Sequence, residues 1–390
     1  MVRGFSGFGF PKAHGAAFGL LAYQSTWLRV HYNPEFLCSL LNEQPMGFYP
    51  PDALVHEAQR RGIEVLPPDV NESDADCGIE REGEVLRVRV GLGYVRGVAE
   101  QEVKELVATR EAGGRFRSLA DLASRAGSSA GSLELLAWSG ACDSLVDDFD
   151  SAHPASPRPA STRPSNARRI ALWQLGVATP GRRVPGGMQL ALPLDLPAPP
   201  ELRSLSRWES MLADYSTTGM TVHSHPLALM RGRLPEGLVR SPDLATLRHG
   251  TRVRVGGLVV ARQRPGTANG IVFVLLEDEH GTINLIVPAE VYERHRLVVR
   301  TEPLILAAGK LERLPAAGGA INILVDRVEP IDAPDHITAE IKDFSMLDEQ
   351  VRRGLAAERA QSDRTSRETE AEDFRAVAPP VMSFASGRRR

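Results

Sequence analysis

The stretch that decides the fold is Arg252–Val287, RVRVGGLVVARQRPGTANGIVFVLLEDEHGTINLIV. It holds three apolar runs of strand length; Gly256-Gly257 interrupts the first, and Asp278–Gly281 is typical of a hairpin turn between the other two. Two further strand patterns, Leu304–Leu311 and Ile321–Val328, follow a helical pattern at 288–296. Five strands with a helix after the third are the order of an OB-fold barrel. An SH3-like barrel is the alternative, which the position of the helix disfavours.

The residues before the barrel are mainly helical in pattern. A strand pattern covers Ile63–Leu66, and residues 85–95 alternate apolar and basic side chains. The residues from Asp335 onward are polar and charged, so we expect a helix that fades into disorder. Helical patterns cover 13–45, with Pro34 opening a second helix, then 52–62, which starts at Asp52, and 100–110, 118–125 and 132–138. The fold class predicted is multidomain α+β, a helical part followed by a five-stranded OB-fold β-barrel.

Composition excludes several classes of protein. The 390 residues are 42% hydrophobic and 24% charged, with 46 basic against 49 acidic side chains, which excludes a disordered chain and a polycation. The apolar run Ala16–Ala22 is too short to span a bilayer and is not followed by a cleavage site. Three widely spaced cysteines argue against a disulfide scaffold or a thiolate zinc site. We expect a soluble, cytoplasmic protein with no membrane partner.

A cationic stretch separates the helical part from the barrel. Residues 151–184 contain no carboxylate but six arginines, Arg168 and Arg169 among them, and are rich in Pro, Ser and Ala. This composition predicts a partly extended linker. A solvated spacer and a segment whose arginines contact phosphate both remain open.

A glycine-rich stretch near the N-terminus, GFGFPKAHGAAF at 7–18, sets up a turn before a helix that begins at about Ala13. A lysine just before a helix N-terminus is well placed for a phosphate, because the backbone N–H groups and the helix dipole favour an anion there. Lys12 and His14 are therefore candidate phosphate ligands. The alternative is an ordinary capped and buried helix.

Residues 7–73 resemble the fingers region of the bacterial C-family DNA polymerases, the catalytic alpha subunits of polymerase III. The run Gln44–Tyr49, QPMGFY, is more similar to the error-prone, damage-tolerance branch than to the replicative branch. The resemblance continues along most of the chain and thins in the linker and the tail. Because the fingers close over the incoming nucleotide in this family, it implies that Lys12 and His14 lie near the triphosphate, with Arg29 a weaker candidate.

Residues 91–110, GLGYVRGVAEQEVKELVATR, resemble the first helix-hairpin-helix element of the same family. There a glycine-bearing hairpin turns backbone N–H groups toward a DNA phosphate without reading sequence. Gly97 matches the pattern, and Arg96 and Gly97 are the candidate DNA contacts. Ala99 stands where a second glycine is usual, which puts close backbone approach there in doubt. An ordinary helix-capping turn is the alternative for Gly97.

The barrel offers a second candidate DNA surface in Arg262-Gln263-Arg264-Pro265-Gly266-Thr267, expected to form the loop after the first strand. OB-folds use this loop to bind single strands, and strong binders add aromatic platforms for the bases. Only Phe273 and Tyr292 could serve as platforms. We therefore expect Arg262 and Arg264 to give weak, sequence-tolerant and salt-sensitive binding.

Three other motifs are set aside. Asp74 and Asp76 have the spacing of paired metal carboxylates but lie in a polar loop with no strand to fix them. His223-Ser224-His225-Pro226 looks like half a metal site without further ligands, and the family has a similar His-Pro, so a structural role is preferred. Gln189–Leu194 resembles a peptide that docks on a sliding clamp but lacks the terminal aromatic residue.

The resemblance divides the chain into six regions. Template-directed polymerisation needs two Mg²⁺ ions held by carboxylates, which in this family lie in the palm upstream of the fingers. No strand of this chain offers them, so we expect no catalytic residue and no metal site in it, and no primer extension by the chain alone. The regions are a fingers remnant at 1–75, a helix-hairpin-helix region at 76–148, a Pro/Arg-rich linker at 149–200, a helical connector at 201–248, the OB-fold at 249–331 and a mostly disordered tail at 332–390.

The function implied is that of the C-terminal part of an error-prone DNA polymerase, a nucleotidyltransferase acting in damage-induced translesion synthesis. The partners implied are primer-template DNA, deoxynucleoside triphosphates, the sliding clamp and accessory mutagenesis proteins. One alternative is a DNA-binding module without catalysis. The other is a fragment of the replicative alpha subunit, which the Gln44–Tyr49 run and the short sequence after the barrel disfavour.

Overall fold

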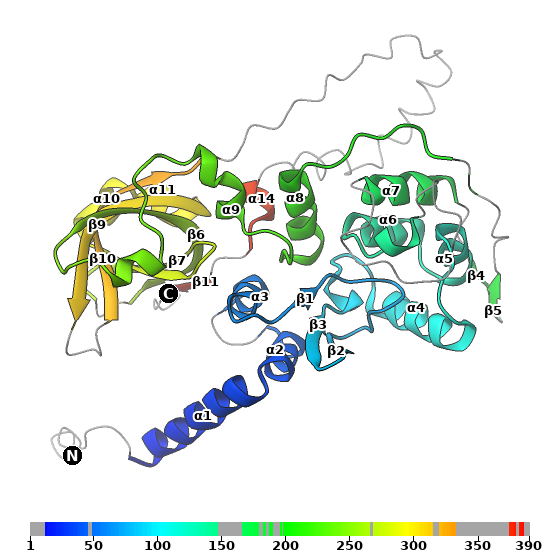
Figure 1. Ribbon diagram of the computed structural model, residues 1–390, viewed down its shortest axis with the longest axis horizontal. Helices are drawn as coiled ribbons and strands as arrows, with labels where there is room; N and C mark the ends of the chain where they lie inside the picture. Colours follow the sequence, from blue (N-terminus) through cyan, green and yellow to red (C-terminus); the bar gives the residue numbers. More distant parts are fainter. Residues whose placement is uncertain are drawn as a thin grey trace, which may run out of the picture.

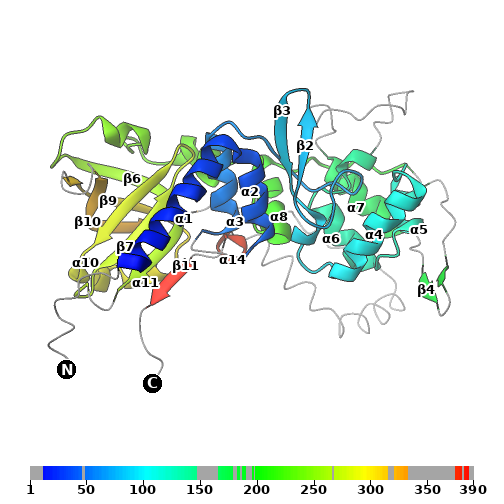
Figure 2. The ribbon, with the colours of Figure 1, turned by 90° about the horizontal axis from the view of Figure 1, so that it is seen from below.

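The computed structural model (Figure 1) places a helical region beside a β-barrel, with the connecting helices α8 and α9 between them. It describes residues 12–45, 49–146, 166–178, 182–184, 187–189, 196, 198–265, 268–314, 320–332, 374–379 and 382–385. A second view, turned by 90°, shows the same order of barrel, connecting helices and helical region along the molecule (Figure 2).

The barrel confirms the predicted OB-fold order. β6, β7 and β8 form an antiparallel meander, β10 pairs parallel with β8 and antiparallel with β9, and β9 returns to β6 and closes the barrel. The core consists of the alternate, inward-facing apolar residues of these strands. The elements are β6 (Arg252–Arg264), β7 (Val272–Glu277), β8 (Thr282–Val287), α10 (Ala289–Arg294), α11 (Arg296–Thr301), β9 (Leu304–Leu314) and β10 (Ala320–Pro330).

Gly256 and Gly257 lie within one continuous strand, β6, which corrects the interruption expected from the sequence pattern. Residues 252–258 of β6 pair with β9, and residues 258–263 pair with β7, so one strand belongs to both walls of the barrel. A Cβ on Gly257 would lie 2.9 Å from the carbonyl oxygen of Glu277 and 2.9 Å from the Cβ of Leu276. Glycine is therefore required where β6 crosses closest to β7.

The helical region follows the predicted boundaries closely. Its helices are α1 (Lys12–His31), α2 (Asn33–Asn42), α3 (Pro51–Arg60), α4 (Glu100–Gly113), α5 (Leu119–Arg125), α6 (Ala130–Trp138) and α7 (Ala167–Val177). Its strands are β1 (Val65–Leu66), β2 (Gly78–Glu82) and β3 (Val85–Arg89), and a second, separate pair is β4 (Arg182–Val184) with β5 (Gly187–Gln189). α8 (Arg207–Thr218) and α9 (Pro226–Met230) lead into the barrel.

The sequence pattern places the start of α3 at Asp52, but the Asp52 side chain does not cap this helix. The N-cap of α3 is Pro50, and Asp52 is almost fully buried. Its carboxylate accepts hydrogen bonds from the Tyr215 hydroxyl at 3.0 Å and from the Thr221 backbone N–H at 3.1 Å. Asp52 therefore ties α3 to the connecting segment of α8 and α9.

α1 carries exposed apolar side chains along its described length. Phe18, Tyr23 and Val30 are 59%, 69% and 68% exposed, although a helix without a polar face is usually buried. Figure 1 shows α1 running out from α2 and away from the other helices. The described part of the chain thus leaves this helix without a core to pack against.

The predicted linker at 149–200 contains a packed helix, α7, which corrects the expectation of an extended spacer. One face of α7 joins the apolar core of α4, α5 and α6. Arg168, a candidate DNA contact, is buried, and its Nη1 lies 3.0 Å from Asp214 Oδ1 and 3.2 Å from the Ser210 carbonyl oxygen. Its guanidinium holds α7 to α8 and is not available to a phosphate.

Part of the predicted disordered tail is also structured. Phe374 in α14 (Phe374–Val377) is almost fully buried, with its ring centroid 5.8 Å from that of Trp208 and 5.6 Å from that of Tyr215. β11 (Met382–Ala385) adds a parallel strand to Ala261–Arg264 of β6. Aromatic packing on α8 and backbone pairing on the barrel edge order these segments despite the polar composition around them.

The buried ion pair of Arg168 gives a test of its role. Arg168→Gln should lower the free energy of unfolding by about 3 kcal/mol, because it leaves the Asp214 carboxylate buried without its counter-charge. The matched control Arg169→Gln, at a half-buried neighbour 3.8 Å from Glu209, should lower it by less than about 1 kcal/mol. Urea denaturation measures both. An Arg168→Gln protein with unchanged stability but weaker DNA binding would contradict the structural role.

Candidate nucleic-acid interface

The hairpin before α4 has the backbone conformation expected of a helix-hairpin-helix element. It consists of a short 3-10 helix, Leu92–Tyr94, and a turn in which Gly97 has φ of +86°. The Arg96 backbone N–H donates to the Thr217 carbonyl oxygen at 2.7 Å, which anchors the hairpin to α8. A positive φ of this size favours glycine, so Gly97 is needed for the turn.

Arg96 is the cation that this hairpin offers. It is exposed, and within the described ranges no carboxylate forms an ion pair with it. The first turn of α4 carries Glu100 and Glu102, whose charges oppose a phosphate at the helix N-terminus. Glu102 instead accepts the Ser129 backbone N–H at 2.8 Å and the Ser132 hydroxyl, which fixes α4 to α6. An anion contact at this hairpin therefore depends on Arg96 and the turn at Gly97.

Arg262 and Arg264 lie within β6 and not in the loop after it, which corrects the sequence expectation. The Arg262 guanidinium donates to the Glu302 carbonyl oxygen, and burial lowers the pKa of Arg262 to about 10, against the opposing effect of Glu302. The Arg264 guanidinium lies 4.5 Å from the centre of the Tyr292 ring and 3.7 Å from Glu293. Both arginines are engaged by the barrel itself, and Tyr292 is buried.

Phe273 is the aromatic platform that remains. It is 37% exposed on the outer face of β7, opposite Ile286 of β8 and Gln263 of β6. Two residues along, Leu275 stands opposite Asn284 on the same face. The outer face of β7 and β8 is thus weakly polar with one exposed ring, a surface on which a base can stack.

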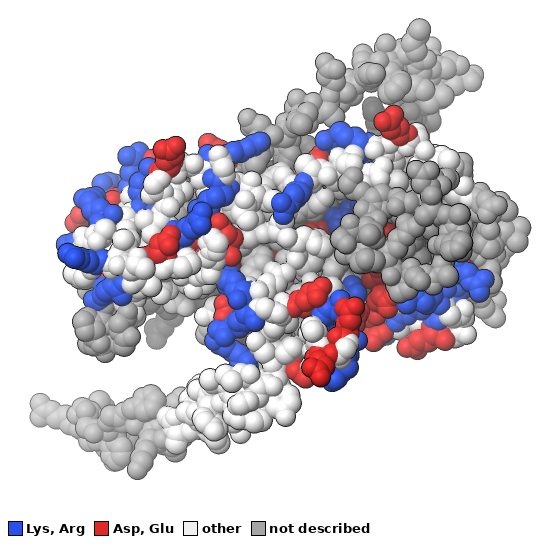
Figure 3. Space-filling model, viewed as in Figure 1, with Lys and Arg blue, Asp and Glu red and all other residues white. Residues whose placement is uncertain are grey.

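Sequence reasoning missed a group of basic side chains on the other wall of the barrel. Arg252 faces Lys310 across β6 and β9, and Arg254 and Arg327 both stand opposite Ala308. Arg252 pairs with Asp326 and Arg327 with Glu329, whereas the described residues place no carboxylate in an ion pair with Arg254 or Lys310. The alternation of arginine and valine at 252–255 is the sequence signal that indicates basic side chains on one face of this strand. Figure 3 shows basic side chains over much of the barrel surface in this view, mixed with acidic ones.

The three candidate nucleotide ligands do not lie together. Lys12 and His14 are in the first turn of α1, and their side chains lie outside the described residues. Arg29 is exposed in the last turn of the same helix, 17 residues on, so about 25 Å of straight helix separates it from Lys12. Arg29 therefore cannot share one phosphate site with Lys12.

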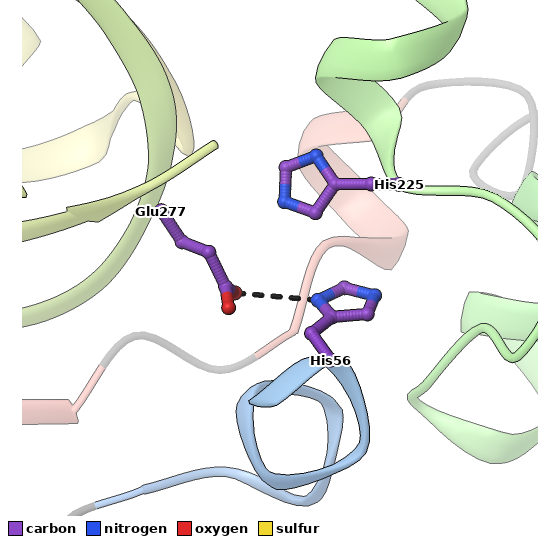
Figure 4. A group of neighbouring side chains, drawn as sticks. All are labelled: His56, His225 and Glu277. Atoms are coloured by element: carbon purple, nitrogen blue, oxygen red, sulfur yellow. Dashed lines mark hydrogen bonds and ion pairs between the residues drawn. The ribbon is translucent and has the colours of Figure 1, made fainter. Parts of the chain in front are cut away.

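A buried group joins the helical region to the barrel (Figure 4). His56 of α3, His225 at the start of α9 and Glu277 of β7 place potential ligand atoms within 4.8 Å of one another. It is the one group of three or more such residues that the described part of the chain contains, and it has a single carboxylate. The sequence around His225 shows no further ligand. His56 and Glu277 come from distant elements, so no sequence signal could have found them.

The other two motifs that were set aside show no site. Asp74 is largely exposed, and its Oδ1 pairs with Arg110 Nη2 at 2.8 Å. Of Gln189–Leu194, the backbone of Gln189 ends β5, and the remainder lies outside the described residues. Within the described part, no helix is long and apolar enough to cross a membrane.

Two family models match the chain. A helix-hairpin-helix motif matches residues 62–150, and an OB-fold nucleic acid binding domain matches residues 253–331. These matches confirm the predicted order of a helix-hairpin-helix region followed by an OB-fold.

Curated relatives of this chain include error-prone DNA polymerases. The chain is 40% identical over 357 residues to an error-prone DNA polymerase of Anaeromyxobacter dehalogenans, which covers 88% of this chain and 28% of the relative. It is 38% identical over 334 residues to the error-prone DNA polymerase of Dechloromonas aromatica, an alignment that covers 85% of this chain and 30% of the relative. The chain therefore spans less than a third of the length of these relatives. Among solved structures, an asparaginyl-tRNA synthetase from Pyrococcus horikoshii matches 30% of this chain and 28% of its own at 17% identity, with a TM-score of 0.19.

The turn at Gly97 can be tested directly. Gly97→Ala should destabilise the protein by about 1 kcal/mol, because an L side chain is strained at positive φ and its Cβ would lie 2.9 Å from a Leu135 methyl group. It should also weaken binding of duplex DNA in fluorescence anisotropy. Gly131→Ala, in α6 with nothing within 4 Å of the added Cβ, is the control and should leave DNA affinity unchanged. Unchanged stability and unchanged affinity in Gly97→Ala would contradict the assignment.

Proposed function

We propose that this chain, a homologue of error-prone DNA polymerases over 88% of its length, supplies the DNA-contacting part of such a polymerase. The observation that carries the proposal is the 40% identity over 357 residues, which includes both nucleic-acid-binding elements in one chain. The helix-hairpin-helix turn contacts the phosphate backbone of the duplex through Arg96 and Gly97. The barrel contacts the single-stranded template through Phe273.

The reaction in which the chain takes part is primer extension by deoxynucleoside triphosphates, with release of pyrophosphate, in damage-induced translesion synthesis. Lys12 and His14 are the residues of this chain that contact the triphosphate. The sliding clamp and accessory mutagenesis proteins are further partners. The names of the relatives support the error-prone branch over the replicative alpha subunit.

The described residues do not fit a two-magnesium centre. Such a centre requires several carboxylates around two ions, and the one group of potential ligands in the described part has a single carboxylate that Arg60 already neutralises. The carboxylates that hold Mg²⁺ belong to a palm that these residues do not include. The exposed apolar side chains of α1 support a packing surface for further polypeptide of the polymerase.

A second function has its own support. The same lack of grouped carboxylates favours a DNA-binding module that acts without catalysis. The two functions share DNA binding and differ in whether added palm-bearing polypeptide restores synthesis.

Catalysis gives the first test. The purified chain, with a primed template, Mg²⁺ and all four deoxynucleotides, should extend no primer in a gel assay. Addition of a polypeptide that spans the rest of a relative's sequence should restore extension, and the same addition without this chain is the control. Growth of product by the chain alone would refute the assignment of the carboxylates to another segment.

Single-strand binding gives the second test. Phe273→Ala should weaken binding of an oligothymidine by about 1–3 kcal/mol, roughly 5- to 150-fold, because a stacked base loses its platform. Phe18→Ala, at a phenylalanine on α1 that is more exposed than Phe273 (59% against 37%), is the control and should change affinity little. Fluorescence anisotropy at several salt concentrations measures both. Equal loss in the two variants would contradict a binding role for the barrel face.

A further inference from the structure

The contact between α3 and the barrel is made of charged and polar side chains in a buried place. Glu277, at the end of β7, is fully buried and receives Arg60 Nη1 at 2.6 Å on one oxygen and His56 Nδ1 at 3.2 Å on the other. Both of these residues belong to α3. By contrast, α8 and α9 pack on the barrel through an apolar cluster that includes Tyr215, Leu227, Leu258 and Phe374. The orientation of α3 on the barrel therefore rests on charge.

The donor set of this group is unsuited to a metal ion. His225 Nδ1 accepts the Leu227 backbone N–H at 3.1 Å and caps α9, so the hydrogen of the neutral ring is on Nε2. Figure 4 shows the His225 ring facing Glu277 and His56. A metal ion would need the lone pair of Nε2, and it would also have to displace Arg60 and His56 from Glu277. The group is better suited to hold a proton.

His56 has a carboxylate on each side of its ring. Nε2 lies 3.5 Å from Asp52 Oδ1, and Nδ1 lies 3.2 Å from Glu277 Oε2, so the ring can donate from both nitrogens only when it is protonated. The other groups that face it are Arg60 on α3 and His225 at the start of α9; Tyr215 of α8 reaches it through Asp52. Burial lowers the pKa of His56, but Asp52 and Glu277 outweigh both burial and Arg60 and raise it above the ordinary value. Burial and the neighbouring His56 and Arg60 lower the pKa of His225, which stays neutral.

We propose that protonated His56 is a latch that holds α3, and with it the packed unit of α2, α3, β1 and β3, on the barrel. Loss of the proton removes the positive charge between the two carboxylates and leaves the ring with one N–H, which can face Glu277 or Asp52 but not both. This unit then loosens from the barrel without unfolding, while α8 and α9 stay packed on the barrel through their apolar cluster. The latch sets how this unit, whose strand β3 leads into the hairpin at Arg96 and Gly97, lies on the barrel, and so extends beyond the proposed function.

The sign of the pH dependence follows from the direction of the shift. A histidine whose pKa is raised in the folded state stabilises that state fully below its unfolded pKa, about 6.5, and the effect is lost as pH rises through the folded pKa. Burial raises the pKa of Asp52 to about 6, against the opposing effect of His56. Asp52 therefore becomes mostly neutral only below that pH. The contact of His56 with Glu277 remains there. The latch is therefore closed at pH 6.5 and opens in the alkaline direction.

The experiment is a spin-label distance measurement on the full chain. Glu84→Cys, in the exposed turn between β2 and β3, and Arg300→Cys, exposed on α11, carry the labels, and the three native cysteines are buried. We expect a narrow distance distribution at pH 6.5 that broadens reversibly by pH 9. His56→Asn should remove the pH response, and Glu277→Gln should shift its midpoint to lower pH. The control His295→Asn, in the barrel but outside this group, should keep the response.

Three other outcomes would contradict the latch. A wild-type distribution that is independent of pH between 6.5 and 9, or an unchanged response in His56→Asn, would overturn it. A ¹⁵N spectrum of histidine-labelled protein gives a readout that does not depend on the label sites. It should contain one ring that titrates above pH 6.5 and vanishes in His56→Asn. Stoichiometric zinc binding at pH 7.5 that is lost in Glu277→Gln would replace the latch with a metal site.

Discussion

The arrangement of this molecule depends on the neutralisation of one buried carboxylate. Glu277 ends β7 inside the junction of the barrel with the helices, where an isolated charge would be very unfavourable. Its two counter-charges, Arg60 and His56, are one turn apart on α3, so neutralisation fixes both the position and the rotation of that helix. Because the pairing is directional, it specifies a single orientation, which an apolar contact of the same size would not do.

The connecting segment of α8 and α9 gives that orientation its second support. Tyr215 is fully buried, packs against Phe374 from the C-terminal segment and donates to Asp52 on α3. One side chain thus joins its own helix to two other parts of the chain, each more than 150 residues away in sequence. Arg168 joins α7 to the same helix through Asp214, the residue next to Tyr215 on α8. The helices between the two DNA surfaces are therefore part of a continuous packed body and not a tether.

Periodicity predicted the elements well and their partners poorly. The barrel order and the helices of the first half followed from alternation, helical spacing and glycine or proline punctuation, all of which are local. Arg168 and Phe374 lie in stretches whose average composition is that of a linker and a tail, and only tertiary contacts order them. The apolar pattern of the first strand ends at Val260, which predicts a loop at Arg262 and Arg264, whereas β6 continues to Arg264 through backbone pairing. His56, His225 and Glu277 come together through packing of distant elements, for which a single sequence carries no signal.

Under the proposed function, the chemistry of the described residues limits how the chain can contact DNA. Arg96 and Gly97 offer a phosphate contact, and Phe273 offers a stacking surface; neither reads the edge of a base. A protein that contacts only backbone and base faces tolerates any template sequence, damaged bases included, because no hydrogen bond to a particular base is lost. The two surfaces are separated by the charged junction at Glu277, so their relative angle decides how duplex and single strand lie on the molecule. If the proposed latch and DNA surfaces are correct, the geometry set at α3 affects how the chain holds DNA more than the affinity of either surface does.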